Sequence, residues 1–178
     1  FFAAIALLAS ACGGGGKSGG GAPKGGIELK LSRKGLTELP SDLGDYKVLQ
    51  RLYADENKIT VLPDALGSLE KLNDIDLSYN QLSALPASLA GAQALEQIDL
   101  SHNKFTEFPE VLLKIPTLRQ IDLRHNDLKH LPEGIKALKN LETIYLIGND
   151  NIDKAERIEY RNWLPKTKIV WTEQRVVQ

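Results

Sequence analysis

Residues 72–86 read LNDIDLSYNQLSALP, and residues 95–109 repeat the pattern as LEQIDLSHNKFTEFP. Two more copies follow the same spacing: LQRLYADENKITVLP at 49–63 and LRQIDLRHNDLKHLP at 118–132. A period of 23 residues predicts a solenoid in which one structural unit stacks on the next. Proline and asparagine mark this period at Pro40, Pro63, Pro86, Pro109 and Pro132 and at Asn57, Asn80, Asn103, Asn126 and Asn149.

Apolar residues at fixed positions of each unit predict a shared interior. Alternate residues of a short strand point to the same side, so Ile75 and Leu77 both face inward. One unit cannot bury its apolar side alone, whereas stacked neighbours form a continuous core. The strands are expected to supply two stacks: Leu52, Ile75, Ile98, Ile121 and Ile144, and then Ala54, Leu77, Leu100, Leu123 and Leu146.

The asparagine column falls where the chain leaves each strand. Its amides are expected to pair with backbone groups of adjacent turns, which burial would otherwise leave without partners. After each proline that recurs with the 23-residue period we expect a short helical stretch, because proline at a first helical position loses no needed hydrogen bond. Pro116 is expected to shorten the helix of its own unit, since proline cannot continue a helix.

The pattern LxxLxLxxNxLxxLP, matched through four full copies, resembles the leucine-rich-repeat family. The resemblance implies an α/β fold: a short horseshoe-shaped solenoid with a parallel concave sheet and short helices or turns on the convex side. Residues 27–150 are expected to form the repeats, including partial copies at both ends, and residues 151–178 a C-terminal cap. In the cap, Ile152, Ala155 and Ile158 have helical spacing, and residues 168–171 are expected to add a last strand.

The N-terminal segment is interpreted as a targeting signal rather than as part of the folded domain. Residues 1–11 are apolar and uncharged, too few for the about 20 residues of a bilayer-spanning helix but suited to a signal-peptide core. Cys12 follows small residues and resembles the lipobox cysteine of bacterial lipoproteins, although Ala9 stands where that family usually has leucine. The resemblance implies acylation of Cys12, and Gly13 favours the outer membrane where the host has two membranes.

Residues 12–26 predict a flexible tether, because nine of residues 13–26 are glycine and glycine has the most backbone entropy to lose on folding.

Residues 11–18 (ACGGGGKS) also match the loose form of a phosphate-binding loop. Such a loop has to join a strand to a helix. Neither is expected here, so nucleotide binding is not predicted. The chain contains no methionine, and we expect its encoded start to be missing.

Composition and spacing narrow the function classes. The formal net charge of -1, without a basic block, argues against a nucleic-acid partner. A single cysteine excludes an internal disulfide and a cysteine-based metal cluster. His102 and His125 occupy equivalent positions with His130 nearby, but a metal site needs a third ligand, so we predict no metal and no cofactor. No nucleophile is placed for catalysis, and we predict that the protein is not an enzyme.

The concave face is the predicted binding surface, because a preformed sheet loses little entropy when a partner binds. Asp76, Asp99 and Asp122 recur at one position of neighbouring units, and strands about 4.8 Å apart would make them an acidic ladder. A basic partner would relieve their repulsion, although Asp-Leu-Ser is also ordinary in this repeat family. The predicted protein-binding residues are Arg51, Tyr53, Asp55, Asp74, Asp76, Gln97, Asp99, Gln120, Asp122, Arg124 and Tyr145.

Two functions fit these features. The first is a protein-binding module, expected to be a monomer, that is anchored to a membrane of the bacterial cell envelope through acylated Cys12. The alternative is a cytosolic signalling scaffold, because the LxxLP repeat type also resembles intracellular proteins that engage small GTPases. The state of Cys12 distinguishes the two.

Overall fold

A computed structural model describes residues 27–172 of the chain. The predicted signal core at 1–11, the predicted tether at 12–26 with its acylated Cys12, and residues 173–178 of the predicted cap lie outside the described residues. Within the described part, no helix is both long enough and apolar enough to span a bilayer.

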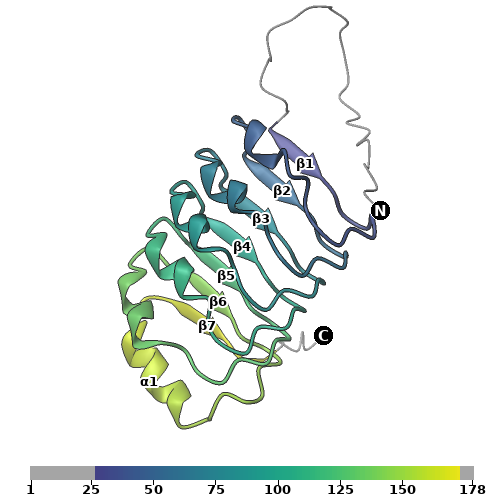
Figure 1. Ribbon diagram of the computed structural model, residues 1–178. Coiled ribbons are helices and arrows are strands. Elements are labelled where there is room, and N and C mark those ends of the chain that lie inside the picture. Colours follow the sequence, from purple (N-terminus) through teal and green to yellow (C-terminus); the bar gives the residue numbers. More distant parts are fainter. Residues whose placement is uncertain (1–26, 173–178) are drawn as a thin grey trace, which may run out of the picture.

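Seven short strands form one parallel sheet in chain order (Figure 1). The register advances by one repeat per strand, so that Ile75 pairs with Ile98 and Ile98 with Ile121. This arrangement confirms the predicted fold class. The strands are β1 (Glu28–Lys30), β2 (Arg51–Tyr53), β3 (Asp74–Asp76), β4 (Gln97–Asp99), β5 (Gln120–Asp122), β6 (Thr143–Tyr145) and β7 (Lys168–Val170).

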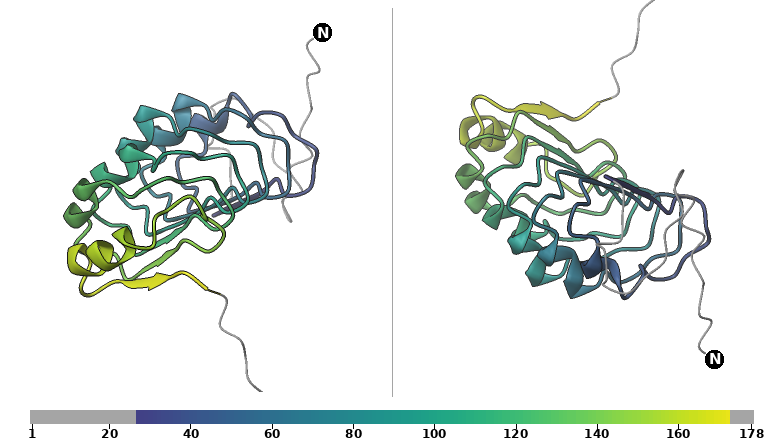
Figure 2. Two further views of the ribbon diagram at one scale, coloured as in Figure 1. Left: turned by 90° about the horizontal axis from the view of Figure 1, so that it is seen from below. Right: turned by 90° about the horizontal axis from the view of Figure 1, so that it is seen from above.

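Short 3-10 helices stack along the side opposite the sheet, as both views of Figure 2 show. Where a proline precedes the helix it occupies the N-cap rather than the first helical position, with an extended backbone at Pro63 (ψ 147°). The predicted effect of Pro116 is wrong: η4 has 5 residues, as η2 does, because it ends at Lys114 before the proline. The helices are η1 (Leu43–Asp45), η2 (Asp64–Ser68), η3 (Ala87–Gly91), η4 (Glu110–Lys114) and η5 (Glu133–Ala137).

The core lies between the sheet and the 3-10 helices. Both predicted strand stacks are buried, with Ile75 and Leu77 each at 0% exposure. Fully burying a side chain of this size contributes about 1.5–3 kcal/mol. Because every repeat from the second to the sixth adds a buried apolar residue at the same two positions, the core extends along the whole solenoid.

The asparagine column is part of this interior, as predicted. The Asn80 amide nitrogen donates to the carbonyl oxygens of Leu77 at 3.0 Å and Ala54 at 2.9 Å, and its Oδ1 accepts the Ile59 N–H at 3.0 Å. Asn103 and Asn126 repeat these contacts one and two repeats later. Each asparagine therefore ties its own turn to the preceding repeat.

The last repeat is closed by α1 (Glu156–Trp163) and by β7, which pairs with β6. The predicted helix is present, but its buried residue is Tyr160, at 1% exposure, whereas Ile158 is 67% exposed. The Tyr160 hydroxyl accepts the backbone N–H of Leu131 at 2.9 Å, and its ring lies 5.2 Å from that of Trp163. A hydrogen-bonded tyrosine thus covers the end of the core where aliphatic spacing predicted isoleucine.

Candidate functional site

The predicted binding residues lie side by side on the exposed face of the sheet. The strand register pairs Asp76 with Asp99 and Asp99 with Asp122, so the acidic ladder exists as a row across β3, β4 and β5. Tyr53 continues this row beside Asp76, and Tyr145 continues it beside Asp122. The row is therefore an acidic centre with a tyrosine at each end.

The last rung of the ladder differs from the other two. Asp122 is only 3% exposed. The Arg124 guanidinium holds its carboxylate, with Nε 2.8 Å and an Nη atom 2.7 Å from Oδ2. The same guanidinium lies 5.4 Å from the centre of the Tyr145 ring. The negative charge of Asp122 is thus compensated inside the protein, and Arg124 covers it.

The opposite end of the sheet is also compensated. Arg51 donates from Nε to Glu28 at 2.8 Å, and Lys30 Nζ lies 3.2 Å from the same carboxylate. Asp55, on the next row, accepts a hydrogen bond from the Ser32 hydroxyl. Positive side chains of β1 and β2 are therefore already engaged.

Between these ends, within residues 27–172, no salt bridge involves Asp74, Asp76 or Asp99. Arg51 and Arg124 act on Asp74 and Asp99 only at longer range. Asp76 and Asp99 accept backbone N–H bonds from Ser78 at 2.9 Å and Ser101 at 2.8 Å. These bonds orient the two carboxylates without neutralising them.

The electrostatics of this centre reflect burial and crowding. Burial, followed by the nearby Asp122 carboxylate, raises the pKa of Asp99 to about 6, against the opposing Ser101 hydrogen bonds. Burial and Asp76 likewise raise the pKa of Asp74, which Arg51 partly opposes. Gln97 is exposed and Gln120 is half-buried beside it, so both are placed to offer uncharged hydrogen bonds. The centre of the face is a group of carboxylates that forms no ion pair within the described residues.

A second column on the rim of this face was missed as a unit by the sequence analysis. The Tyr79 ring stacks on His102 at 3.9 Å between centroids, and His102 stacks on His125 at 4.3 Å. His130, the third histidine of this region, lies outside the stack, with its Nε2 3.5 Å from a Glu107 carboxylate oxygen. Among the described residues no group of three or more potential ligands could hold a metal ion. The 23-residue spacing of Tyr79, His102 and His125 was the available signal.

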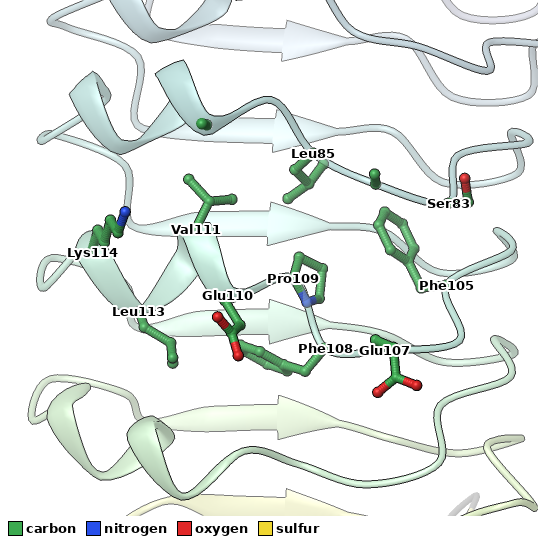
Figure 3. A pocket seen from close by; sticks show the side chains of 12 residues that line it. Ser83, Leu85, Phe105, Glu107, Phe108, Pro109, Glu110, Val111, Leu113 and Lys114 are labelled. Atoms are coloured by element: carbon green, nitrogen blue, oxygen red, sulfur yellow. The ribbon is translucent and has the colours of Figure 1, made fainter.

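A shallow depression of about 490 Å³ opens on another side, between the chain segments before η3 and around η4 (Figure 3). Leu85 and Val111 face it, and Glu110 and Lys114 lie at its margin (Figure 3). Its lining offers apolar contact but no convergent polar groups, unlike a typical small-molecule site.

A parallel sheet that adds one strand per 23-residue unit, backed by 3-10 helices and tied by buried asparagines, defines a leucine-rich-repeat solenoid. The family model described as leucine rich repeat matches residues 47–105. The solved structure of a leucine-rich-repeat protein of Leptospira interrogans is similar at 34% sequence identity with a TM-score of 0.59. The match covers 66% of this chain and 33% of that one, so this chain spans about a third of the Leptospira protein's length.

No curated protein matches the chain. Domains built from this repeat are typically protein-binding modules and are generally non-catalytic. The solenoid fold predicted from the sequence is confirmed, while the lipoprotein-like N-terminus stays a prediction.

Proposed function

We propose that this chain is a non-catalytic protein-binding module that recognises its partner on the concave face, and that the partner presents basic groups there. The supporting observation is the uncompensated centre formed by Asp74, Asp76 and Asp99, flanked by charges that are already paired. Two unit charges about 4–5 Å apart repel by about 1 kcal/mol in water and by more when partly buried. A cationic group between them replaces that repulsion with attraction.

The backbone beneath these side chains favours recognition without rearrangement. The hydrogen-bond ladder continues beyond the strands, with Leu77 N–H donating to Asp99 O at 2.9 Å and Leu100 N–H to Asp122 O at 2.8 Å. A surface held in this way loses little conformational entropy on binding. Charge complementarity then sets which partners are accepted and how fast they associate.

The test removes the charges and keeps the shape. A triple variant, Asp74→Asn, Asp76→Asn and Asp99→Asn, retains the oxygens that accept the Ser78 and Ser101 N–H groups. Asp122 is left intact, because removing it would free Arg124. We expect the variant to bind an oligolysine peptide at least about tenfold more weakly than wild type in low salt, and to lose partners captured from an envelope extract.

A matched control makes the same charge change on the convex side. Asp64, Glu110 and Glu133 begin three 3-10 helices and are exposed. Their replacement by Asn, Gln and Gln should leave binding close to that of wild type. Equal binding by the concave variant and wild type would reject this face as the contact surface.

We also propose that the module is lipid-anchored in the bacterial cell envelope through Cys12, on the outer membrane where the host has one. The support is the apolar run 1–11 directly before the only cysteine and the glycine-rich run after it. Stable anchoring needs more than one acyl chain, which lipoprotein-type acylation would supply. The full-length protein should enter the detergent phase, and Cys12→Ala should return it to the aqueous phase. An unmodified N-terminus in wild type would instead favour the cytosolic scaffold.

A further inference from the structure

One turn residue in each repeat adopts a left-handed backbone. Arg33, Glu56, Tyr79, His102 and His125 have φ values of 57°, 52°, 53°, 53° and 50°, and Gly148 continues the column at 73°. This conformation costs an ordinary L-residue roughly 1–2 kcal/mol, so the surroundings have to hold it. The same backbone position therefore accepts five residue types over six repeats.

In three consecutive repeats the turn residue is a ring, and the rings form a stack. Tyr79 and His102 are nearly parallel, at an interplanar angle of 11°, and His102 and His125 at 22°. The stack ends on Gly148, where an added Cβ would lie 2.4 Å from His125 Nδ1. The His125 ring thus rests directly on the backbone of the next repeat.

The charged and titratable groups around the stack give protonation little compensation. The Tyr79 phenol faces His102 on one side, and Gly148 brings no charge on the other. Arg124 and Asp122 both interact with His102, but Asp122 already holds Arg124. Burial, then His125 and Arg124, lower the pKa of His102, and Asp122 opposes them. Charging both imidazoles would align three cations, counting Arg124, along this rim.

We propose that the Tyr79–His102–His125 stack is a pH-sensitive switch: it closes the turns of repeats three to five near neutral pH and opens them when both histidines are protonated. Imidazole is the side chain whose charge ordinarily changes between about pH 5 and pH 8. Two imidazolium rings whose centroids lie 4.3 Å apart repel each other, and within residues 27–172 neither imidazole makes a side-chain hydrogen bond that would oppose the repulsion. Opening would break the backbone hydrogen bonds of these turns.

Two backbone hydrogen bonds of these turns would break on opening. His102 N–H donates to Arg124 O at 2.8 Å, and His125 N–H donates to Ile147 O at 2.7 Å. The same column supplies an internal comparison at Glu56, whose N–H donates to Ser78 O at 3.0 Å. Glu56 forms an ion pair with Arg33, an attraction that persists at pH 5, so that turn should not respond.

Opening would change the rim of the proposed binding face, because His102 follows Asp99 by three residues. Acidification would then release a partner held there. This consequence depends on the proposed function, whereas the switch itself does not and is tested without any partner.

The experiment is amide hydrogen exchange on the full chain at pH 7 and pH 5, with rates corrected for their intrinsic pH dependence. The protection factors of the His102 and His125 amides should fall roughly fivefold more than that of the Glu56 amide. A fivefold ratio corresponds to a repulsion of about 1 kcal/mol, which is the interaction energy of two unit charges near 4 Å apart in water. The Leu100 amide, inside the ladder, should keep its protection.

The matched variant is His102→Asn with His125→Asn. Asparagine tolerates the left-handed conformation and does not titrate, so the variant should fold and its turn amides should no longer respond to pH. His130→Asn, outside the stack, should behave as wild type. The proposal is overturned if the three turn amides and Leu100 change equally in wild type, or if the double variant keeps the response.

Discussion

Two neighbouring positions of the same turn behave in opposite ways along the solenoid. Asn103 is hydrogen-bonded to the backbone of two repeats, and every repeat from the second to the sixth has asparagine there. His102, one residue earlier, belongs to a column in which only the backbone conformation recurs. The inner position serves backbone geometry and carries asparagine in every repeat after the first, where Lys34 stands. The outer position is constrained in φ alone, so its side chain is free to acquire chemistry.

The largest effect is expected where the inner column is broken. In Asn126→Ala the Phe105 N–H and the Leu100 carbonyl lose their partners, at 3.0 Å each, in a site that is 5% exposed. Each buried group left without a hydrogen bond costs about 1–3 kcal/mol, so urea unfolding should show a loss of about 3–5 kcal/mol. Asp127→Ala, at the exposed next residue, should change stability by less than about 0.5 kcal/mol. A loss below about 1 kcal/mol in Asn126→Ala would erase the distinction between the columns.

The second prediction concerns the place where the outer column ends. Gly148→Ala meets both a positive φ of 73° and the His125 ring at 2.4 Å, and should cost about 2–3 kcal/mol. In a His125→Asn background the contact is relieved and only the backbone component, about 1 kcal/mol, should remain. The double-mutant cycle measures this difference. Equal costs in both backgrounds would show that His125 does not rest on Gly148.

The third prediction compares His102 of the outer column with Asp99 of strand β4. Their contributions to the free energy of unfolding should change with pH in opposite directions. Because the folded-state pKa of Asp99 is raised to about 6, its ionisation destabilises the fold above that pH. Asp99→Asn should therefore stabilise the protein at pH 7 by about 1–2 kcal/mol. The gain should vanish as the pH falls through 6 toward the unfolded-state value. His102, with a lowered pKa, acts in the opposite direction: its contribution is present above pH 6.5 and is lost as the pH falls below it. Urea unfolding from pH 4.5 to 7.5 resolves the two.

The smallest effect is expected at the start of the outer column. Arg33 and Glu56 pair across one repeat, with both side chains exposed. Exposed ion pairs contribute about 0.2–1 kcal/mol. A double-mutant cycle with Arg33→Ala and Glu56→Ala should give a coupling in this range that weakens in 0.5 M salt. A coupling above about 2 kcal/mol would mean that this pair, like the asparagines, is part of the repeat's structural framework.

Features that repeat with the backbone could be predicted from the sequence, and features that depend on side-chain direction could not. Ile75, Leu77 and Asn80 were placed by period and strand alternation, because identical units have to stack in register. The pairing of Asp122 with Arg124 could not be predicted from the pattern, in which both residues are candidate contacts for a partner. Strand alternation places both on the concave face, but it does not say which way the guanidinium turns.

The cap and the ring stack show the same limit. Helical spacing identified Ile158 but not Tyr160, whose burial depends on how α1 docks on the last repeat. Tyr79 and His102 do not by themselves predict a left-handed turn, since that conformation is usually indicated by glycine or asparagine. Their 23-residue spacing places them in one column, but the equal φ values and the parallel rings come only from the structure.

The parallel register has a consequence for the length of the molecule. From β1 to β6 every strand residue lies beside the residue 23 positions away, as Asp76 lies beside Asp99, so joining residue 71 to residue 95 would remove one unit and leave all remaining columns aligned. A deletion that is not a multiple of 23 residues would displace every later side chain from its neighbours. The reach of the binding face can therefore grow or shrink only in whole steps, each about the 4.8 Å that separates one strand from the next.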